Sequence, residues 1–277
     1  MKDQSLSAGL ENALVLNVSK RGDGRHRILR IEHEGKPVVV KCYGLKRNRL
    51  STALRQFGSL VIVGKSSVTA KARCRTERET LTLWHNEGFD VPRVYSIDFP
   101  SLEPCLAMEW MPGQTLSDLI QSKEESLETK KDLIRRFTEI LARRHERALA
   151  LNEARLLFEH PTLNHLIQSG DRLVHFDFEI VFTWKRDLER LIRRELAGFI
   201  RPMVRKSRKE ETDGLLGVMV RTYPEKVCLR HVLKELEQFG SVPVLHWLKG
   251  FQKLPFFRKK GNTVTAAALA RALKKGV

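Results

Sequence analysis

Asp177 and Asn164 are the residues of this sequence whose types and spacing favour metal chemistry. Asp177 follows the largely apolar segment 173–176, which is typical of a strand, and Asn164 lies 13 residues earlier. An Asn on a loop and an Asp at the end of the next hairpin can hold Mg²⁺ against the phosphates of ATP. The pair therefore predicts a magnesium–nucleotide site. The structural alternatives are a turn residue at 177 and a helix cap at 164.

The segment 36–43 predicts a strand that carries a functional lysine. Its β-branched residues are typical of strands, and Lys41 lies near its far end. Because an unpaired buried ammonium is costly, Lys41 needs an anionic partner if the strand is buried. The alternative is a lysine that extends from the strand end into solvent.

Glu77 is the expected partner of Lys41. Leu81 and Trp84 follow Glu77 by four and seven positions, so a helix over 73–84 places all three on its inward face. Glu79, on a neighbouring face, is the second candidate for this role. A solvated helix residue is the alternative for Glu77, because the surrounding charges are mixed.

Two further segments have weaker signals for nucleotide binding. The apolar segment 106–113 resembles the hinge whose backbone groups bind adenine in kinase-like enzymes, so Glu109 and Met111 are candidates for main-chain contacts. Gly22 and Gly24 are candidates for a phosphate loop, although the third glycine of that pattern is missing.

Composition and charge indicate an anionic partner. The chain has 277 residues, a hydrophobic fraction of 42%, which is enough for a sizeable core, and a formal net charge of +17. Nucleic acid, acidic lipid head groups and phosphorylated sugars all fit this charge. Aromatic residues make up only 7% of the chain, and it has neither a zinc finger nor an RNP-type motif. We therefore expect nucleic acid to be the least favoured of the three partners.

The cysteines and the N-terminus point to the cytoplasm. The four cysteines have no metal-ligand spacing, which predicts reduced core or surface thiols. No basic-then-apolar signal sequence opens the chain, and no apolar run reaches about 18 residues. We expect a cytoplasmic protein, either soluble or peripheral on a membrane.

The distribution of periodic segments predicts an α+β protein with two lobes. Residues 1–112 are rich in strands and form the expected N-lobe, whereas residues 113–277 are mostly helical and form the expected C-lobe. The charged run 206–211 is the expected exposed loop of the second lobe. The clearest periodic segments are strands at 14–18, 27–31 and 38–42 and amphipathic helices around 133–141 and 188–200.

Taken in their order along the chain, the motifs around Lys41, Glu77, Asn164 and Asp177 resemble those of the bacterial lipopolysaccharide kinase family. Its kinase-fold enzymes phosphorylate heptose or Kdo (3-deoxy-manno-octulosonic acid) in the inner core of lipopolysaccharide. The shared features are the long basic stretch 43–70 between Lys41 and Glu77, the helix leading from Glu77 to Trp84, and the segment 186–191 after Asp177. The resemblance covers roughly residues 14 to 205.

The resemblance implies transfer of the γ-phosphoryl group of ATP to a sugar hydroxyl. Lys41 would neutralise phosphate charge and be positioned by Glu77, while Asn164 and Asp177 would hold Mg²⁺. Glu159 stands five residues before Asn164, where the family has its catalytic Asp. The longer side chain leaves two interpretations open: a kinase with a Glu base, and a pseudokinase that binds nucleotide without transferring phosphate.

The expected substrate partner is the lipopolysaccharide core glycolipid. The basic runs 46–55 and 185–209 would suit such a phosphorylated glycolipid, together with acidic lipids of the inner membrane, at its cytoplasmic face. A kinase of aminoglycosides or other small molecules is a further alternative, because it shares the fold. A basic nucleic-acid-binding protein is the alternative from another functional class.

Overall fold

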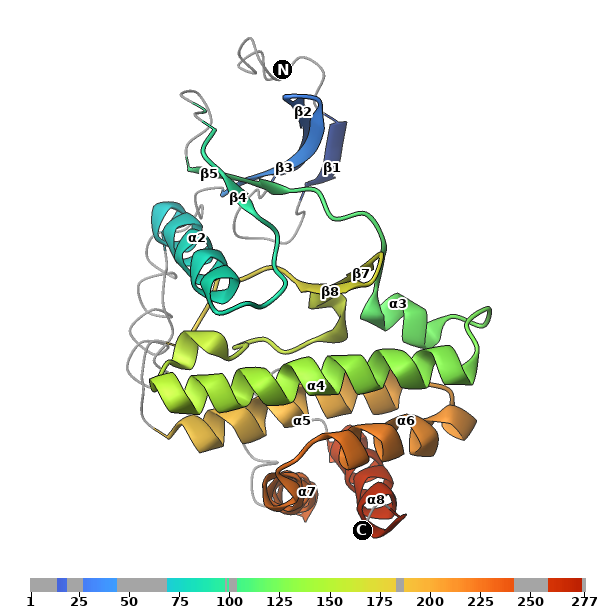
Figure 1. Ribbon diagram of the computed structural model, residues 1–277. Helices are drawn as coiled ribbons and strands as arrows, with labels where there is room; N and C mark the ends of the chain where they lie inside the picture. The colour runs from blue at the N-terminus through green and yellow to red at the C-terminus, as the bar shows by residue number, and fades with distance from the viewer. Residues whose placement is uncertain are drawn as a thin grey trace. The chain divides into compact units, whose positions relative to one another are not determined.

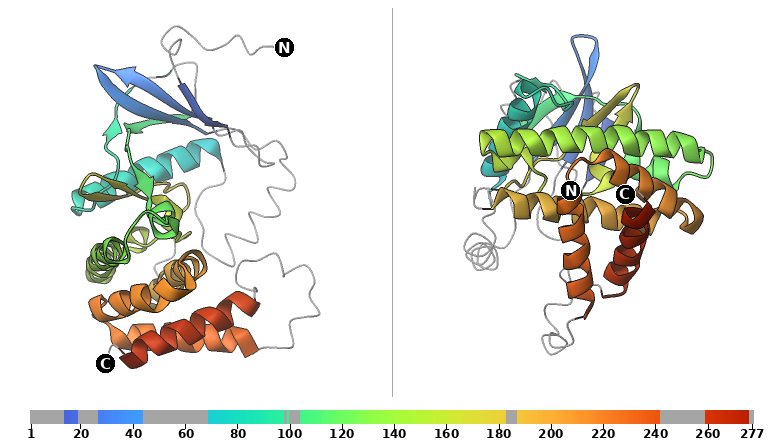
Figure 2. Two further views of the ribbon diagram at one scale, coloured as in Figure 1. Left: turned by 90° about the vertical axis from the view of Figure 1, so that its right-hand side faces the viewer. Right: turned by 60° about the horizontal axis from the view of Figure 1, so that its bottom comes forward.

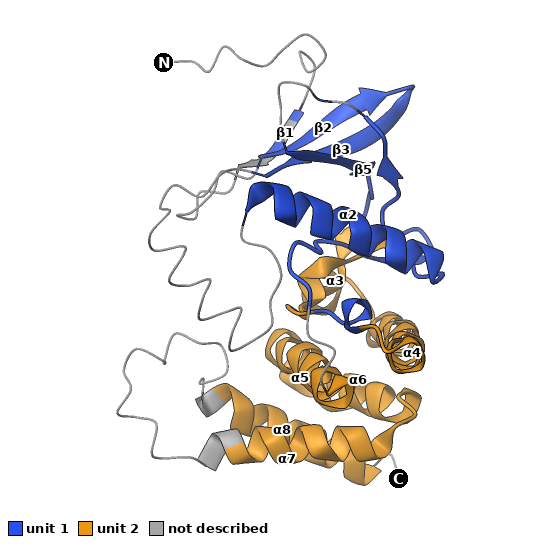
Figure 3. Cartoon of the chain, turned by 90° about the vertical axis from the view of Figure 1, so that its left-hand side faces the viewer, with its two compact units in different colours: residues 1–113, 154–158, 169–185 blue, residues 114–153, 159–168, 186–277 orange. Residues whose placement is uncertain are grey.

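The computed structural model describes residues 14–18, 27–43, 69–97, 99, 104–182, 187–241 and 259–275. Gly22, Gly24 and the basic run 46–55 lie outside these residues. The chain forms two compact units (Figure 3). Unit 1 comprises residues 1–113, 154–158 and 169–185, and unit 2 comprises residues 114–153, 159–168 and 186–277.

Unit 1 contains an antiparallel sheet whose five strands have the order β1-β2-β3-β5-β4 (Figure 1). The strands predicted at 14–18, 27–31 and 38–42 are confirmed. Alternate residues of β2, β3 and β5 form the apolar core on one face of the sheet, among them Leu29, Val38, Val40 and Ala107. The strands are β1 (Leu14–Val18), β2 (Arg27–His33), β3 (Lys36–Cys42), β4 (Val94–Tyr95) and β5 (Cys105–Glu109).

A two-residue turn fixes the register between β2 and β3. His33 pairs with Lys36, and Glu34 and Gly35 between them have φ angles of 51° and 72°. Positive φ at both central residues is the type I′ geometry that matches the twist of a hairpin. This register opposes Val40 to Leu29, and therefore places both in the core.

Helix α2 (Ala70–Asn86) completes the main elements of unit 1 and confirms the helix predicted at 73–84. Its first turn is capped by Thr69, whose hydroxyl accepts a hydrogen bond from the backbone N–H of Ala72. The inward face buries Glu77, Leu81 and Trp84, as the spacing predicts. The remaining elements of unit 1 are the 3₁₀ turn η1 (Ala154–Leu156) and β8 (Arg172–His175).

An aromatic cluster holds α2 to the rest of unit 1. The Trp84 ring makes edge contacts with Phe89, Phe158 and Phe178, with centroids 5.9, 5.4 and 4.7 Å away. Its indole N–H donates to the carbonyl of Arg155 at 2.9 Å. Because Phe178 directly follows Asp177, the cluster anchors the segment that carries this carboxylate.

Unit 2 is mainly helical, and the amphipathic helices predicted around 133–141 and 188–200 are confirmed. Figure 2 shows α7 and α8 side by side. The helices are α3 (Leu116–Gln121), α4 (Leu127–Leu151), α5 (Leu188–Lys206), α6 (Lys209–Thr222), α7 (Lys226–Ser241) and α8 (Lys259–Lys275), with η2 (Leu163–His165) and the short strands β6 (Gln114–Thr115) and β7 (Leu166–Ser169).

Buried ion pairs join the helices of unit 2. Arg144 of α4 lies 2.6 Å from Glu195 of α5, and both side chains are completely buried. Lys130 of α4 lies 3.0 Å from Glu211 of α6. A lone buried charge is strongly destabilising, so each partner requires the other.

The exposed loop predicted at 206–211 is wrong. Lys206 ends α5 and Lys209 begins α6, so only Ser207 and Arg208 connect the two helices. Glu211 is buried because its carboxylate binds Lys130. None of the helices in the described part of the chain is long and apolar enough to span a membrane.

Candidate active site

Lys41 is the centre of a charged cluster in unit 1. Since side chains alternate along β3, Val40 points into the apolar core and Lys41 faces α2. Its ammonium Nζ lies 2.9 Å from Oε2 and 3.2 Å from Oε1 of Glu77. The contact predicted from the helix periodicity is therefore present, whereas Glu79 lies near Arg75 at 3.7 Å.

Two more carboxylates bind the same ammonium. Oδ1 of Asp177 lies 2.6 Å from the Lys41 Nζ, and Oε1 of Glu179 lies 2.9 Å from it. Three carboxylates around one lysine leave a net negative charge, which Arg73 partly offsets through a contact of 3.1 Å with Glu179. Such a cluster is suited to bind a further cation.

Glu77 is fixed by neutral donors as well as by Lys41. The hydroxyl of Tyr43 donates to its Oε2 at 2.5 Å, and the backbone N–H of Phe178 donates to its Oε1 at 3.2 Å. Glu77 therefore connects the strand that carries Lys41 with the segment that carries Asp177.

The electrostatics follow from burial and from the clustering of carboxylates. Burial raises the pKa of Glu77, the Lys41 ammonium opposes this shift, and the Asp177 carboxylate adds to it. Burial lowers the pKa of Lys41, but Glu77, Asp177 and Glu179 outweigh this effect and hold it above its ordinary value. The three carboxylates therefore favour the charged form of Lys41.

The backbone at Asp177 has an uncommon conformation. Its φ angle is 71°, in the left-handed region that non-glycine residues rarely adopt. Asp is among the residues that tolerate this region best. The conformation falls two residues after the end of β8, where the chain brings first Asp177 and then Glu179 to Lys41. Backbone strain of this kind concentrates at functional sites.

The two hinge candidates differ in their backbone contacts. The N–H of Glu109 donates to the carbonyl of Arg93 at 2.8 Å, and its side chain lies 3.4 Å from Arg172. Within the described residues, no hydrogen bond uses the N–H of Met111. Met111 is therefore the better of the two candidates for a main-chain contact with adenine.

Glu159 lies in unit 2, with its side chain completely buried. Its Oε1 lies 3.4 Å from Arg194 of α5, and its Oε2 lies 2.7 Å from Nε2 of His160. Close packing holds this loop on α5, because a Cβ atom at Gly198 would lie 2.1 Å from Cγ of Pro161. Gly198 therefore permits a contact that no other residue would allow.

Asn164 also lies in unit 2, exposed on η2 after the cap residue Thr162. Its Oδ1 accepts a hydrogen bond of 3.1 Å from Nζ of Lys206, the last residue of α5. Lys206 also donates to the hydroxyl of Ser117. The amide oxygen predicted to bind Mg²⁺ is thus oriented toward a positive charge.

The structure brings Lys41, Glu77 and Asp177 together within unit 1, and it places Glu159 and Asn164 within unit 2. The roles assigned to these residues from sequence stay predictions.

Sequence reasoning missed two members of the unit 1 cluster, Glu179 and Tyr43. Spacing offered a signal for Tyr43, because it lies two residues beyond Lys41 and alternate residues of an extended segment share a face, whereas the left-handed backbone at Asp177 makes this rule unusable for Glu179. No spacing in the sequence predicts the contact between Lys206 and Asn164, which are 42 residues apart.

The carboxylate oxygens of the cluster decide whether it can hold a divalent cation. Oxygen atoms of Glu77, Asp177 and Glu179 lie within 4.8 Å of one another. Asp177 is partly exposed and Glu179 is less so, whereas Glu77 is buried and already bound to Lys41 and Tyr43. Asp177 and Glu179 therefore fit a hard cation best.

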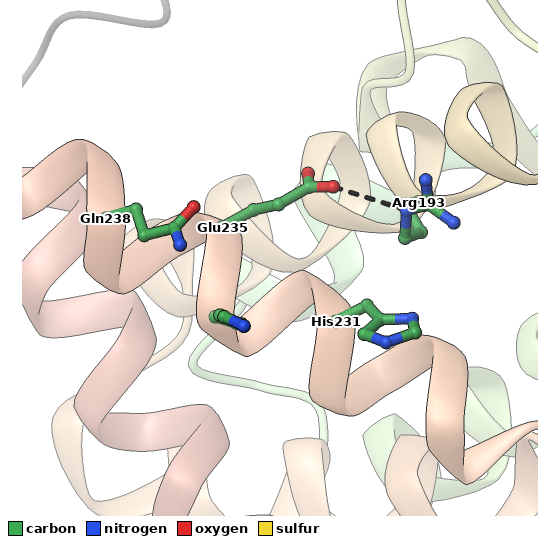
Figure 4. Close-up of a pocket in the computed structure, with 5 residues that line it drawn as sticks. Arg193, His231, Glu235 and Gln238 are labelled. Carbon is green, nitrogen blue, oxygen red and sulfur yellow. Dashed lines mark hydrogen bonds and ion pairs between the residues drawn. The ribbon is translucent and has the colours of Figure 1, made fainter.

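A separate pocket of about 300 Å³ lies on the surface of unit 2 (Figure 4). Arg193 and Glu235 form an ion pair of 3.2 Å beside it. None of the predicted site residues lines this pocket, which is bounded by Arg193, His231, Lys234, Glu235 and Gln238.

The five-stranded sheet with α2 in unit 1 and the helices of unit 2 form the β-rich and helical parts expected of a two-lobed, kinase-like α+β fold. The model of the Phosphotransferase enzyme family (APH) matches residues 4–199, and the chain belongs to this family. None of the curated proteins compared matches the chain significantly.

Two solved structures illustrate the structural likeness. An aminoglycoside-3'-phosphotransferase of type VIII has 13% identity and a TM-score of 0.42, with 96% of this chain and 93% of that chain covered. A choline kinase from Cryptosporidium parvum Iowa II has 12% identity and a TM-score of 0.39, with 97% and 91% covered.

Proposed function

We propose that this protein is an ATP- and Mg²⁺-dependent phosphotransferase that acts on a heptose or Kdo sugar of the lipopolysaccharide inner core. Membership of a phosphotransferase family supports the reaction class. The observation that carries the nucleotide site is the buried contact of Lys41 with Glu77, beside the carboxylates of Asp177 and Glu179. A lysine paired with a glutamate, beside an aspartate that can hold Mg²⁺, is the arrangement by which kinases bind metal-associated phosphates.

Each charged residue has a role in this proposal. Lys41 contacts the nucleotide phosphates, and Glu77 positions its ammonium. Asp177 and Glu179 would hold Mg²⁺, for which Asn164 remains the ligand predicted from sequence, and the ion would supply positive charge to the phosphates. Met111 would bind adenine through its backbone.

The substrate proposal rests on the sequence resemblance and on charge. A net charge of +17 favours an anionic acceptor such as a phosphorylated glycolipid at the cytoplasmic face of an inner membrane with acidic lipids. The net charge of the whole chain disfavours a cationic acceptor such as an aminoglycoside or choline, although the cluster around Lys41 is itself acidic. A nucleic acid fits the charge but not a phosphotransferase acting on small hydroxyl groups.

One observation favours a second candidate, a nucleotide-binding protein without phosphotransfer. Glu159, at the position of the catalytic base, is completely buried and in contact with Arg194 and His160. A base must reach the hydroxyl proton that it accepts. Transfer therefore requires Glu159 to leave these contacts or His160, which is exposed, to take the proton.

Thermal unfolding with and without Mg²⁺ and ATP tests the nucleotide site. At about 100 times the dissociation constant, binding adds about 2.7 kcal/mol and raises the unfolding midpoint by about 5 to 10 °C. We expect Asp177→Ala to lose this shift and Glu159→Ala to keep it. Absence of a shift in the wild-type protein, or its equal loss in both variants, would contradict the assigned roles.

Transfer of labelled γ-phosphate then tests the substrate. The acceptors are purified lipopolysaccharide cores that carry unphosphorylated heptose or Kdo, with kanamycin and choline as comparison acceptors. We expect label in the lipopolysaccharide alone and its loss in Glu159→Ala. Label in kanamycin or choline would refute the substrate, and nucleotide binding without transfer to any acceptor would establish the second candidate.

A further inference from the structure

Two cysteines face each other across neighbouring strands of unit 1. In the antiparallel pair β3–β5, Cys42 is the direct partner of Cys105. Their sulfur atoms lie 2.7 Å apart, with the Cys105 thiol donating to Sγ of Cys42. This separation is shorter than an ordinary contact between two thiols, so each side chain is already turned toward the other. Both are free thiols in the structure.

The backbone geometry permits a covalent bond between them. Residues that are direct partners in an antiparallel ladder have Cα atoms roughly 4.5 to 5.5 Å apart. A disulfide requires Cα separations of about 4.4 to 6.8 Å and a sulfur–sulfur bond of about 2.05 Å. Bond formation therefore needs a side-chain shift of less than about 1 Å, without rearrangement of the sheet.

The surroundings of the pair favour formation of a disulfide between Cys42 and Cys105. Cys42 is buried at the edge of the apolar core, whereas Cys105 is half-buried and therefore accessible to a small oxidant. The hydrogen bond from Cys105 lowers the pKa of Cys42, and the charge of Arg27 acts in the same direction against the effect of burial. A thiolate at Cys42 is the nucleophile that disulfide formation requires.

We propose that Cys42 and Cys105 are a reversible oxidation site whose co-reactant is a small disulfide such as oxidised glutathione. One cysteine thiolate attacks the glutathione disulfide and releases one glutathione thiolate. The second cysteine attacks the resulting mixed disulfide, forms the Cys42–Cys105 bond and releases the second glutathione. Two protein thiols are oxidised and one glutathione disulfide is reduced to two thiols, so electrons balance without a further reagent.

The position of the pair connects it to the nucleotide site. Cys42 directly follows Lys41 on β3, and the loop closed by the disulfide contains α2, which carries Glu77. A third cysteine, Cys74 of α2, donates its thiol to the backbone carbonyl of Cys105, at 3.3 Å, whereas the sulfur–sulfur contact found among the described residues joins Cys42 and Cys105. In a reducing cytoplasm, disulfides of this kind are transient and respond to redox state.

The full-length protein, incubated with oxidised glutathione and then alkylated, tests the proposal by thiol counting and peptide mass mapping. We expect the four thiols of the chain to fall to two, with residues 42 and 105 in one cross-linked peptide, and dithiothreitol to restore all four. The Cys228→Ser variant is the matched control, and it should form the same cross-link.

Cys105→Ser is the decisive variant, and because residue 105 is only half-buried it preserves the core that Cys42→Ser could disturb. It should form no intramolecular disulfide. Retention of four thiols in the wild-type protein, a cross-link through Cys74 or Cys228, or a stable glutathione adduct on a single cysteine would each overturn the proposal.

Discussion

The strongest test of the charged cluster is removal of the Lys41 ammonium. In Lys41→Met, the carboxylates of Glu77, Asp177 and Glu179 keep their positions but lose the ammonium that lies 2.6 to 3.2 Å from them. Breaking a buried ion pair by removing one partner costs about 3 to 5 kcal/mol. Because Asp177 is 37% exposed and screened by water, we place the loss at the lower end, about 3 kcal/mol.

The loss of stability in Lys41→Met should be larger at high pH than at low pH. Burial already raises the pKa of Glu77, and removal of the Lys41 charge raises it further. A carboxyl whose pKa is higher in the folded state than in the unfolded state stabilises the protein at low pH, and this stability is lost as pH rises through the folded pKa. Lys41→Met should therefore be closer to the wild type at pH 5 than at pH 8.

Urea unfolding followed by circular dichroism at these two pH values measures both effects, and a loss of about 3 kcal/mol corresponds to a midpoint about 6 to 12 °C lower on heating. Lys36→Met, an exposed position on the same strand, is the control and should change stability little. Equal stability of Lys41→Met and the control, or a larger loss at pH 5 than at pH 8, would refute the assignment of Lys41 as the counter-ion of three carboxylates.

Two further predictions concern unit 2. Gly198→Ala should destabilise the protein by about 1 to 3 kcal/mol in urea unfolding, because the new Cβ would lie 2.1 Å from Cγ of Pro161. Gly214→Ala is the control: the nearest atom to its Cβ lies at 3.4 Å, so this substitution should stabilise the helix by up to about 1 kcal/mol. Equal changes of stability in the two variants would exclude the packing constraint at Gly198. Burial lowers the pKa of His145, so its protonation favours the unfolded state and stability falls below about pH 6.5. His145→Gln should weaken this dependence between pH 7 and 5, and His231→Gln, exposed on α7, should not; a pH profile unchanged from the wild type in His145→Gln would contradict this.

Local patterns in the sequence determined the elements and part of the site. The alternation along 36–43 places Lys41 opposite the core face, and the spacing of Glu77 from Leu81 and Trp84 places all three on one face of α2. Both inferences use only the geometry of a single element, which the chain fixes locally. The strands of the sheet and the main helices follow from the same periodicities.

Charge runs were a poorer guide, because burial of a charge depends on a distant partner. Residues 206–211 have the composition of an exposed loop, but Lys130, 81 residues before Glu211, neutralises that carboxylate in the interior. No property of the local segment distinguishes a solvated Glu from one with a buried counter-ion.

The contacts that define the candidate site were decided by the tertiary structure. Lys41 and Asp177 are 136 residues apart, and their contact requires the left-handed backbone at Asp177 and the anchoring of Phe178 beside Trp84. The sulfur contact of Cys42 depends in the same way on the register of two strands that are distant in sequence. The sequence by itself determines which face of an element each side chain occupies, and the packing of elements determines which faces meet.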